Sequence, residues 1–218
     1  MQNLTTLRDF LRYTLSQFHH HQVFFGQGSD SAFDEATYLV FGALNLPWQG
    51  DDRLLDASLT EAEKAKLHQL INQRCQARKP LAYLLGEAWY AGLRFKVKED
   101  VLIPRSPLVE VIETAFAGLL DEEQPPARVL DLCTGSGCIG IATAYAFPTA
   151  EVVLTDISPQ ALAVAEENIR QHQLEKRVTA VASDVFSQLN STEKFDLIVT
   201  NPPYVNPADL NTMPAEFS

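Results

Sequence analysis

The sequence contains few cysteines and no long hydrophobic run. Three of its 218 residues are cysteine, and Cys75, Cys133 and Cys138 match neither a disulfide framework nor the spacing of a zinc site. No apolar stretch approaches the roughly 18 residues that a membrane-spanning helix requires. The first residues also lack the hydrophobic core and the cleavage site of a secretory signal peptide. We therefore expect a cytoplasmic protein that has no membrane partner.

Basic residues are also scarce. Lys and Arg number 17 against 28 Asp and Glu, which gives a formal net charge of −11. A negative field of this kind repels the phosphates of nucleic acids and attracts basic proteins. Acidity also keeps a protein soluble, so it does not specify a partner by itself. It argues against an independent DNA-binding surface and is compatible with a basic protein partner.

The first part of the chain has the apolar spacing of helices. Leucines and a phenylalanine recur at helical intervals over residues 4–18, and further helices are predicted over 33–44 and from Thr60, where Thr60 and Glu63 fit a capping box. Residues 1–86 are therefore expected to form a small helical domain. The three consecutive histidines at 19–21 cannot all face one ion from a helix, so no metal site is predicted.

The period changes near residue 87. The alternation in "EAWYAGLRFKVKEDVLIPR" predicts a β-hairpin linker over residues 87–105. Ser106 and Pro107 are typical of a helix start. The apolar residues that follow at helical spacing are expected to form a buried stripe: Val109, Ile112, Phe116 and Leu119.

From residue 128 onward, strands and helices alternate. Strands are predicted at "RVLDL", "AEVVLTD", "RVTAVASD" and "FDLIVTN", with helices over 137–146 and from Ser158 between them. This alternation predicts a Rossmann-like, parallel and doubly wound α/β sheet in a domain over residues 106–218.

A glycine-rich loop joins the first of these strands to its helix. In "DLCTGSGCIG", Gly135, Gly137 and Gly140 fit the dinucleotide pattern G-x-G-x-x-G, and Asp156 follows the next strand 21 residues after Gly135. Glycines let the backbone approach a ligand, and an acidic residue at that position can hold ribose hydroxyls. The loop predicts a cofactor that contains adenosine; a tight turn without a ligand is the alternative.

Asp131 narrows the choice of cofactor. A carboxylate directly before the glycines would repel a pyrophosphate, whereas it suits a ligand with a cationic end, such as S-adenosylmethionine. The same residue argues against an NAD dehydrogenase. Asp184, after the third strand, can accept a hydrogen bond from the adenine amino group, with Val185 or Phe186 beside the ring. Taken alone, Asp184 is equally well explained as a turn or helix-cap aspartate.

The fourth strand ends in "TNPPYVNP" because proline cannot donate to a sheet ladder. The side-chain carbonyl of Asn201 and the main-chain carbonyl of Pro202 can accept both hydrogens of a planar NH2 group, and Tyr204 offers a ring face. We therefore predict Asn201, Pro202 and Tyr204 as catalytic. The candidate cofactor-binding residues lie in the glycine loop or after a strand: Asp131, Thr134, Gly135, Gly137, Asp156, Ile157, Asp184, Val185 and Asn201.

With these motifs the chain resembles the class I methyltransferases that modify glutamine side-chain amides in translation proteins. The helical region, the hairpin ending in "LIPR", "LDLCTGSGC" and "NPPY" occur in that family's order across nearly the whole chain. The resemblance implies an S-adenosylmethionine-dependent methyltransferase domain. It also implies that the loop glycines, Asp156 and Asp184 bind the cofactor, that "NPPY" binds glutamine, and that residues 1–86 recognise the substrate.

Two branches of this family are candidates. "PRSPLVEVIE" and "FFGQGSDSAFDEA" resemble the branch that methylates large-subunit ribosomal protein three (uL3) and differ from the "PDTE"-like segment of the release-factor branch. A basic ribosomal protein also suits the negative charge. The alternatives are a release-factor methyltransferase, an adenine-amino DNA methyltransferase, which would need base flipping, and a non-enzymatic adenosine-binding module.

The end of the sequence departs from the family pattern. Strands of the family's sheet are missing after "FDLIVTN", and "MPAEFS" resembles the middle of family sequences. We therefore expect a methyltransferase domain that is incomplete at its carboxyl end.

Overall fold

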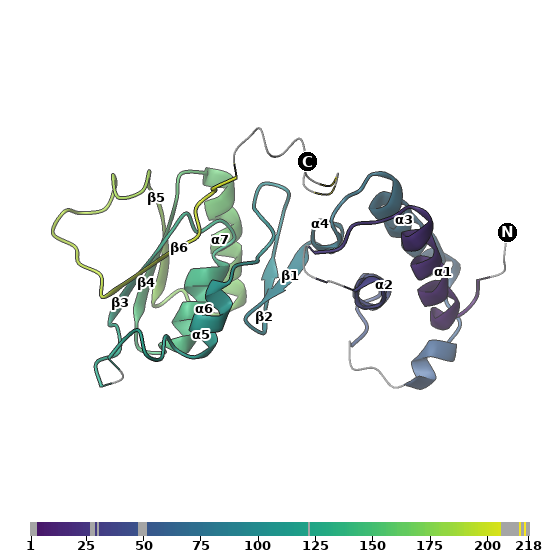
Figure 1. The fold of residues 1–218 in the computed structure, drawn as a ribbon, viewed down its shortest axis with the longest axis horizontal. Helices are drawn as coiled ribbons and strands as arrows, with labels where there is room; N and C mark the ends of the chain where they lie inside the picture. The colour runs from purple at the N-terminus through teal and green to yellow at the C-terminus, as the bar shows by residue number, and fades with distance from the viewer. Residues whose placement is uncertain are drawn as a thin grey trace. The chain divides into compact units, whose positions relative to one another are not determined.

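The computed structural model describes residues 4–26, 29, 31–47, 52–121, 123–205, 214 and 216. The chain divides into two compact units, one of residues 1–85 with 205–218, here called the helical unit, and one of residues 86–204, here called the α/β unit (Figure 1). Each unit has its own buried hydrophobic cluster. Most of the "MPAEFS" segment lies outside the described residues. The predicted boundaries at 86 and 105, and the role of the first domain in recognition, stay predictions.

The helical unit is built from helices that begin at polar caps. Its elements are α1 (Leu7–His20), α2 (Ala32–Ala43), the 3-10 helix η1 (Asp52–Asp56), α3 (Glu61–Gln76) and α4 (Leu81–Leu85). The capping box predicted at Thr60 and Glu63 is present at α3, and Thr6 and Asp9 form a second one at α1. None of the helices that the structure describes is long and apolar enough to cross a membrane.

The buried side of α1 differs in part from the predicted stripe. Leu7 and Phe18 are buried as expected, but Phe10 and Thr14 complete the buried side, while the other predicted leucines are half-buried. Thr14 can be buried because its hydroxyl donates to the backbone oxygen of Phe10 at 2.7 Å. A polar residue whose hydroxyl bonds to the backbone of its own helix can be buried, and a pattern of apolar residues does not predict this.

A buried ion network lies inside the helical unit. The guanidinium of Arg74, 2% exposed, donates to Glu35 at 2.5 Å, to the backbone oxygen of Phe24 at 2.7 Å and to Glu216 at 3.4 Å. Arg78 also contacts Glu216 at 3.3 Å. Burial raises the pKa of Glu35 despite Arg74. The pKa of Glu216 is lowered because its backbone and arginine partners outweigh its burial. No sequence pattern predicted this network.

The α/β unit begins with the predicted hairpin. Strands β1 (Glu87–Tyr90) and β2 (Leu93–Lys96) pair antiparallel, with Tyr90 opposite Leu93. Ala91 and Gly92 between them both have positive φ, as a two-residue hairpin turn requires.

The helix predicted after Ser106 is shorter than expected. Helix α5 spans Leu108–Glu113, with Pro107 in the cap position, and the Ser106 hydroxyl accepts the N–H of Leu108 at 3.3 Å. Ala115 and Phe116 adopt positive φ and end the helix. Ile112 and Phe116 are buried as predicted, whereas Val109 is half-buried. The prediction that Leu119 is buried was wrong, because its side chain is 70% exposed. The apolar residues keep helical spacing beyond Glu113, but this spacing does not show that the backbone turns left-handed at Ala115 and Phe116.

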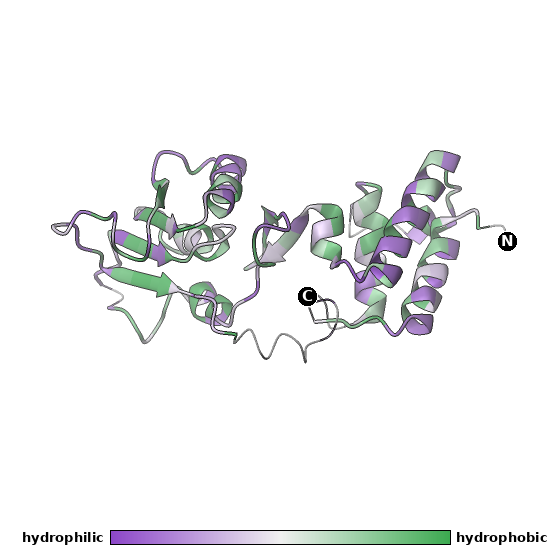
Figure 2. Cartoon of the chain, turned by 90° about the horizontal axis from the view of Figure 1, so that it is seen from above, coloured by the Kyte–Doolittle hydropathy of each residue, from purple (hydrophilic) through white to green (hydrophobic). Residues whose placement is uncertain are grey.

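The sheet of the α/β unit is parallel throughout. Its elements are β3 (Arg128–Leu132), α6 (Cys138–Ala146), β4 (Glu151–Asp156), α7 (Pro159–Gln171), β5 (Val178–Ala182) and β6 (Leu197–Thr200). The strand order is β5-β4-β3-β6, so the chain winds outward from β3 to β5 and then returns to the other side of β3. Figure 2 shows these strands as largely hydrophobic. Ligands of such sheets bind where the winding direction reverses, outside the carboxyl ends of the strands.

Helices α6 and α7 cover one face of this sheet (Figure 1). Leu154 of β4 packs beneath the start of α6, where a Cβ on Gly140 would lie only 2.1 Å from its side chain. Gly140 therefore allows α6 to approach the sheet closely. The segment between β5 and β6 contains no helix or strand and lies on the side of the sheet away from α6 and α7 (Figure 1).

Candidate functional site

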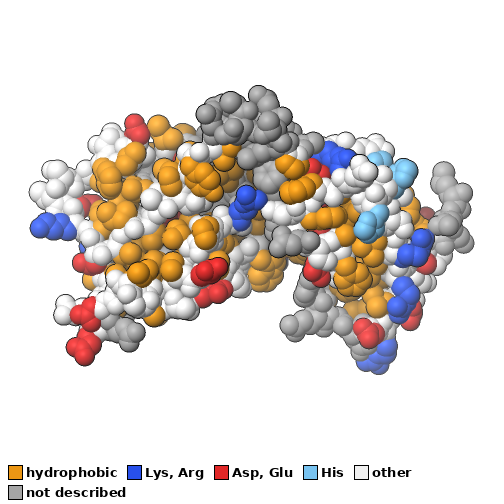
Figure 3. Space-filling view, in the orientation of Figure 1, with side chains coloured by type: hydrophobic (Ala, Val, Ile, Leu, Met, Phe, Trp, Pro, Cys, Tyr) orange, Lys and Arg blue, Asp and Glu red, His pale blue; other side chains and the backbone are white. Residues whose placement is uncertain are grey.

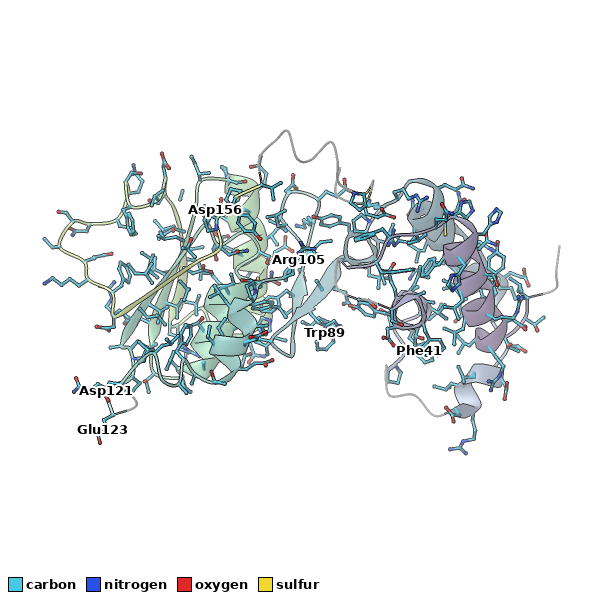
Figure 4. All side chains as sticks on the ribbon, viewed as in Figure 1. Phe41, Trp89, Arg105, Asp121, Glu123 and Asp156 are labelled. Carbon is cyan, nitrogen blue, oxygen red and sulfur yellow. The ribbon has the colours of Figure 1, made fainter. Side chains whose placement is uncertain are left out.

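The two predicted motifs leave the sheet from neighbouring strands. β3 and β6 pair in parallel, and their last residues, Leu132 and Thr200, are partners in the register. The hydroxyl of Thr200 donates to the backbone oxygen of Leu132 at 2.9 Å. The glycine loop begins directly after Leu132 and Asn201 directly after Thr200, so both start at the point where the winding reverses. Figure 4 labels Asp156 at this end of the sheet and Asp121 and Glu123 at the other.

The glycine loop has an open part and a packed part. Gly135 has φ +56° and a Cβ there would meet nothing within 4 Å, so its backbone is open to a ligand. Gly137 has φ +83°, and a Cβ there would lie 3.2 Å from Leu154 and 3.3 Å from Ala165. Gly137 is therefore required for packing as well as for the turn. Of the predicted cofactor-binding glycines, Gly135 offers the accessible backbone.

Asp131 lies fully buried beneath this loop. Its Oδ2 accepts the Thr134 hydroxyl at 2.6 Å and the Gly140 N–H at 2.9 Å. Its Oδ1 has no hydrogen-bond partner among the residues that the structure describes. Burial raises the pKa of Asp131 to about 7, and the nearby charge of Asp156 adds to this. Thr134, also predicted as a cofactor contact, turns its hydroxyl inward and orients Asp131.

Asp156 ends β4 and holds the loop from the adjacent strand. One carboxylate oxygen accepts the Gly135 N–H and the other accepts the Ser158 N–H, both at 2.9 Å. A carboxylate has about four acceptor positions, so two bonds leave it able to accept ribose hydroxyls. Ile157 beside it is 70% exposed. The sequence predicted that a helix starts at Ser158, which is the N-cap of α7, but it did not predict the bond from the Ser158 N–H to Asp156.

The segment after β5 lies next to Asp156. The N–H of Ser183 donates to the backbone oxygen of Asp156 at 3.0 Å. Asp184 is exposed, and Val185 and Phe186 are 47% and 52% exposed. Exposed apolar side chains beside a strand end are suited to cover the flat ring of a base.

The "NPPY" residues are accessible at the same end of the sheet. Asn201 is half-buried and Pro202 is exposed, while Tyr204 is 78% exposed. No hydrogen bond to the Asn201 carboxamide is found within the described part of the chain. Likewise, the described residues hold no group of three or more His, Cys, Asp or Glu placed to bind a metal ion.

These observations fit S-adenosylmethionine. The buried, unpartnered oxygen of Asp131 is suited to a cationic ligand, and the open backbone at Gly135 lies beside the ribose-binding carboxylate expected at Asp156. Register and backbone bonds place the starts of the loops after β3, β4, β5 and β6 at one end of the sheet. The assignment of each residue to the cofactor or the substrate stays a prediction.

Known proteins resemble this chain over nearly its whole length. A family model described as the methyltransferase small domain matches residues 113–216. A protein of Francisella tularensis subsp. tularensis (strain SCHU S4), named ribosomal protein uL3 glutamine methyltransferase, is 46% identical over 217 residues, which are 100% of this chain and 69% of the relative. A protein of Bordetella pertussis (strain Tohama I) with the same name is 43% identical over 216 residues, 99% of this chain and 72% of the relative. The chain belongs to the uL3 glutamine methyltransferase family.

Family membership confirms the resemblance found in the sequence, together with the α/β methyltransferase fold. Among solved structures, a 16S rRNA N2 G1207 methyltransferase of T. thermophilus in complex with AdoMet and guanosine aligns with 56% of this chain and 33% of its own chain. The identity is 25% and the TM-score is 0.40, so this alignment adds no argument about the site.

Proposed function

We propose that this protein transfers a methyl group from S-adenosylmethionine to the side-chain amide nitrogen of a glutamine in ribosomal protein uL3. The observation that carries the proposal is the pairing of Leu132 with Thr200, since it starts the glycine loop and "NPPY" on adjacent strands. A cofactor loop and an amide-binding motif at one end of the sheet are what methyl transfer to an amide requires. The names of the two relatives supply the substrate.

The cofactor-binding residues contact different parts of S-adenosylmethionine. Asp156 accepts the ribose hydroxyls, and Ile157, Val185 and Phe186 offer apolar surface to the adenine ring. Asp184 accepts a hydrogen bond from the adenine amino group. Asp131, held by Thr134, supplies a negative charge under the open backbone of Gly135. When bound, S-adenosylmethionine supplies an electrophilic methyl group.

Asn201 and Pro202 position and polarise the glutamine amide. An amide nitrogen is a poor nucleophile because its lone pair is delocalised into the carbonyl. The side-chain oxygen of Asn201 and the backbone oxygen of Pro202 accept the two amide hydrogens and stabilise the positive charge that develops on nitrogen. The prolines hold these two oxygens at a fixed spacing, and Tyr204 covers one face of the planar amide.

Charge is distributed unevenly between the two units. Residues 86–204 contain 17 acidic and 9 basic side chains, whereas residues 1–85 contain 9 and 8. On the face shown in Figure 3, most of the visible Lys and Arg side chains lie over the helical unit. Attraction to a basic ribosomal protein is therefore a property of the α/β unit, and we assign contacts that discriminate between substrates to residues 1–86.

The proposal is tested by incubating the protein with S-adenosylmethionine, labelled in its methyl group, and unmethylated uL3, with an unmethylated release factor in competition. Mass spectrometry should find one added methyl on a single glutamine of uL3 and almost none on the release factor. Preferential modification of the release factor would move this chain to that branch. Modification of adenine in added DNA would move it to the DNA methyltransferases. Calorimetry that shows no S-adenosylmethionine binding would overturn the proposal itself.

A further inference from the structure

Asn168 connects the glycine loop to the β-hairpin. This residue of α7 is 0% exposed. Its Oδ1 accepts the backbone N–H of Lys96 at 2.7 Å. Its Nδ2 donates to the backbone oxygen of Lys96 at 3.0 Å and to that of Ser136 at 2.8 Å. One carboxamide therefore binds both backbone groups of the last residue of β2 and a carbonyl of the glycine loop.

The three partners of Asn168 require a primary amide. Two of them are carbonyl oxygens and need donors, and the third is an N–H and needs an acceptor. An aspartate at this position has the acceptor but neither donor while it is ionised, and an aliphatic side chain has none of the three. The carboxamide accepts from the N–H of Lys96 and donates to its C=O, as the backbone of a neighbouring strand does in a sheet.

The bond to Ser136 fixes the middle of the glycine loop. The Ser136–Gly137 peptide lies between the two glycines with positive φ. Its carbonyl accepts from Asn168, and its N–H donates to the backbone oxygen of Thr134 at 2.9 Å, so the peptide is held on both sides. The Thr134–Gly135 peptide, two peptides earlier, is held by the bond from its N–H to Asp156. Without Asn168, this peptide would keep only the bond to Thr134, and the accessible backbone of Gly135 would be held less firmly.

We propose that Asn168 is a positioning residue for S-adenosylmethionine: it fixes the shape of the glycine loop and makes that shape depend on the hairpin. The inference rests on the proposed function, because it names the cofactor of that site. Asn168 touches neither cofactor nor substrate in this scheme. It acts through Ser136, and through Lys96 it links the cofactor loop to the end of β2.

Gln171 provides a matched control. It lies on the same helix, and its Nε2 donates to the hairpin at the backbone oxygen of Arg94, at 2.6 Å. It makes no bond to the glycine loop among the hydrogen bonds of the described residues. Gln171→Ala therefore removes a bond between α7 and the hairpin and leaves the loop alone.

Calorimetric titration with S-adenosylmethionine tests the proposal, with thermal unfolding measured on each ligand-free variant. Asn168→Ala should raise the Kd about tenfold, about 1.4 kcal/mol, and should increase hydrogen exchange over residues 133–140. Gln171→Ala should leave the Kd within about twofold. An unchanged Kd in folded Asn168→Ala overturns the proposal. Absence of binding by the wild type would overturn the proposed function instead.

Asn168→Asp carries the test if the alanine variant does not fold. It keeps the size and the acceptor for Lys96, and it regains one donor only when its carboxyl is protonated. The ratio of its Kd to that of the wild type should fall as the pH is lowered. A ratio near one at every pH would contradict the role assigned to the two donors.

Discussion

The helical unit buries a guanidinium among carboxylates, whereas the α/β unit buries a carboxylate with no cation bonded to it among the described residues. Arg74 contacts Glu35 and Glu216 as well as the backbone of Phe24. Asp131 accepts only from a hydroxyl and a backbone N–H, and one of its oxygens has no described partner. Removing one partner of a buried ion pair destabilises the fold strongly, because the other charge is left buried alone. A buried charge that has no partner already lowers the stability of the native protein. The first arrangement stabilises the fold, and we propose that the second is part of the cofactor site.

The largest effect is expected where the buried charges are paired. Arg74→Met leaves Glu35 buried without its cation and leaves Glu216 with Arg78 as its partner. It should lower the free energy of unfolding of the helical unit by about 3–5 kcal/mol. Arg8→Met is the control because its pair with Asp56 is exposed on both sides, and it should cost less than about 1 kcal/mol. Urea titration measures both. Equal losses in the two variants would show that burial of Arg74 adds nothing.

The next effect is on turnover rather than stability. Asn201→Ala removes one of the two acceptors of the amide hydrogens, so turnover should fall about 10²-fold or more, roughly 2.7 kcal/mol. The S-adenosylmethionine Kd should change by only a few-fold. Asn190→Ala, in the turn before β6, is the control and should leave turnover unchanged. Near-normal turnover in Asn201→Ala would remove this residue from the mechanism.

A smaller effect is expected on cofactor affinity. Asp156→Ala should weaken S-adenosylmethionine binding by about 1.5–3 kcal/mol, the range for hydrogen bonds to charged groups. Asp196 is a matched control, since its carboxylate accepts the N–H groups of Ala127 and Arg128, both at 2.9 Å, at the amino end of the same sheet. Asp196→Ala removes a similar pair of bonds far from the site. Calorimetry that finds equal losses in both variants would assign the Asp156 effect to stability.

The sequence predicted the parts of the site that depend on strand order and residue type. Alternating strands and helices predicted the parallel sheet, and the positions of Asp131, Asp156 and Asn201 after or near strand ends follow from it. The sequence did not predict that Gly137 is packed, that Thr134 faces Asp131, or that Asn168 holds Ser136. The packing of Gly137 and the bond of Asn168 to Ser136 depend on distances between segments far apart in the chain, which a single sequence does not encode in a readable pattern. The bond between Thr134 and Asp131 is local, but it depends on how the side chain of Thr134 turns, which the sequence pattern does not show. The prediction for Leu119 was wrong for a local reason, because positive φ at Ala115 and Phe116 ends the helix.

The smallest effect concerns the pH dependence of stability. Each unit provides a carboxyl group with a shifted pKa, and the two shifts have opposite directions. The pKa of Asp131 is raised to about 7 by burial, against about 3.9 in an unfolded chain. Between these values the folded protein binds more protons than the unfolded one, so the free energy of unfolding should fall as the pH rises from about 4 to about 7. Asp131→Asn should flatten that slope and stabilise the α/β unit at pH 8 by about 1–3 kcal/mol, because it removes the buried charge while its amide oxygen still accepts from Thr134 and Gly140.

Asp9 in the helical unit is the control for this slope. Backbone bonds from Thr5 and Thr6 lower its pKa to about 2, so its stabilising contribution is complete above about pH 4 and is lost only as the pH falls towards 2. Asp9→Asn should therefore leave the slope between pH 4 and 7 as it is. Asp131→Asn should also weaken S-adenosylmethionine binding at pH 8, where the wild-type carboxylate is ionised, and much less at pH 5, where it is protonated. If Asp131→Asn stabilises the protein and binds the cofactor as tightly as the wild type at both pH values, the unpaired charge has no role in the site and the contrast with Arg74 fails.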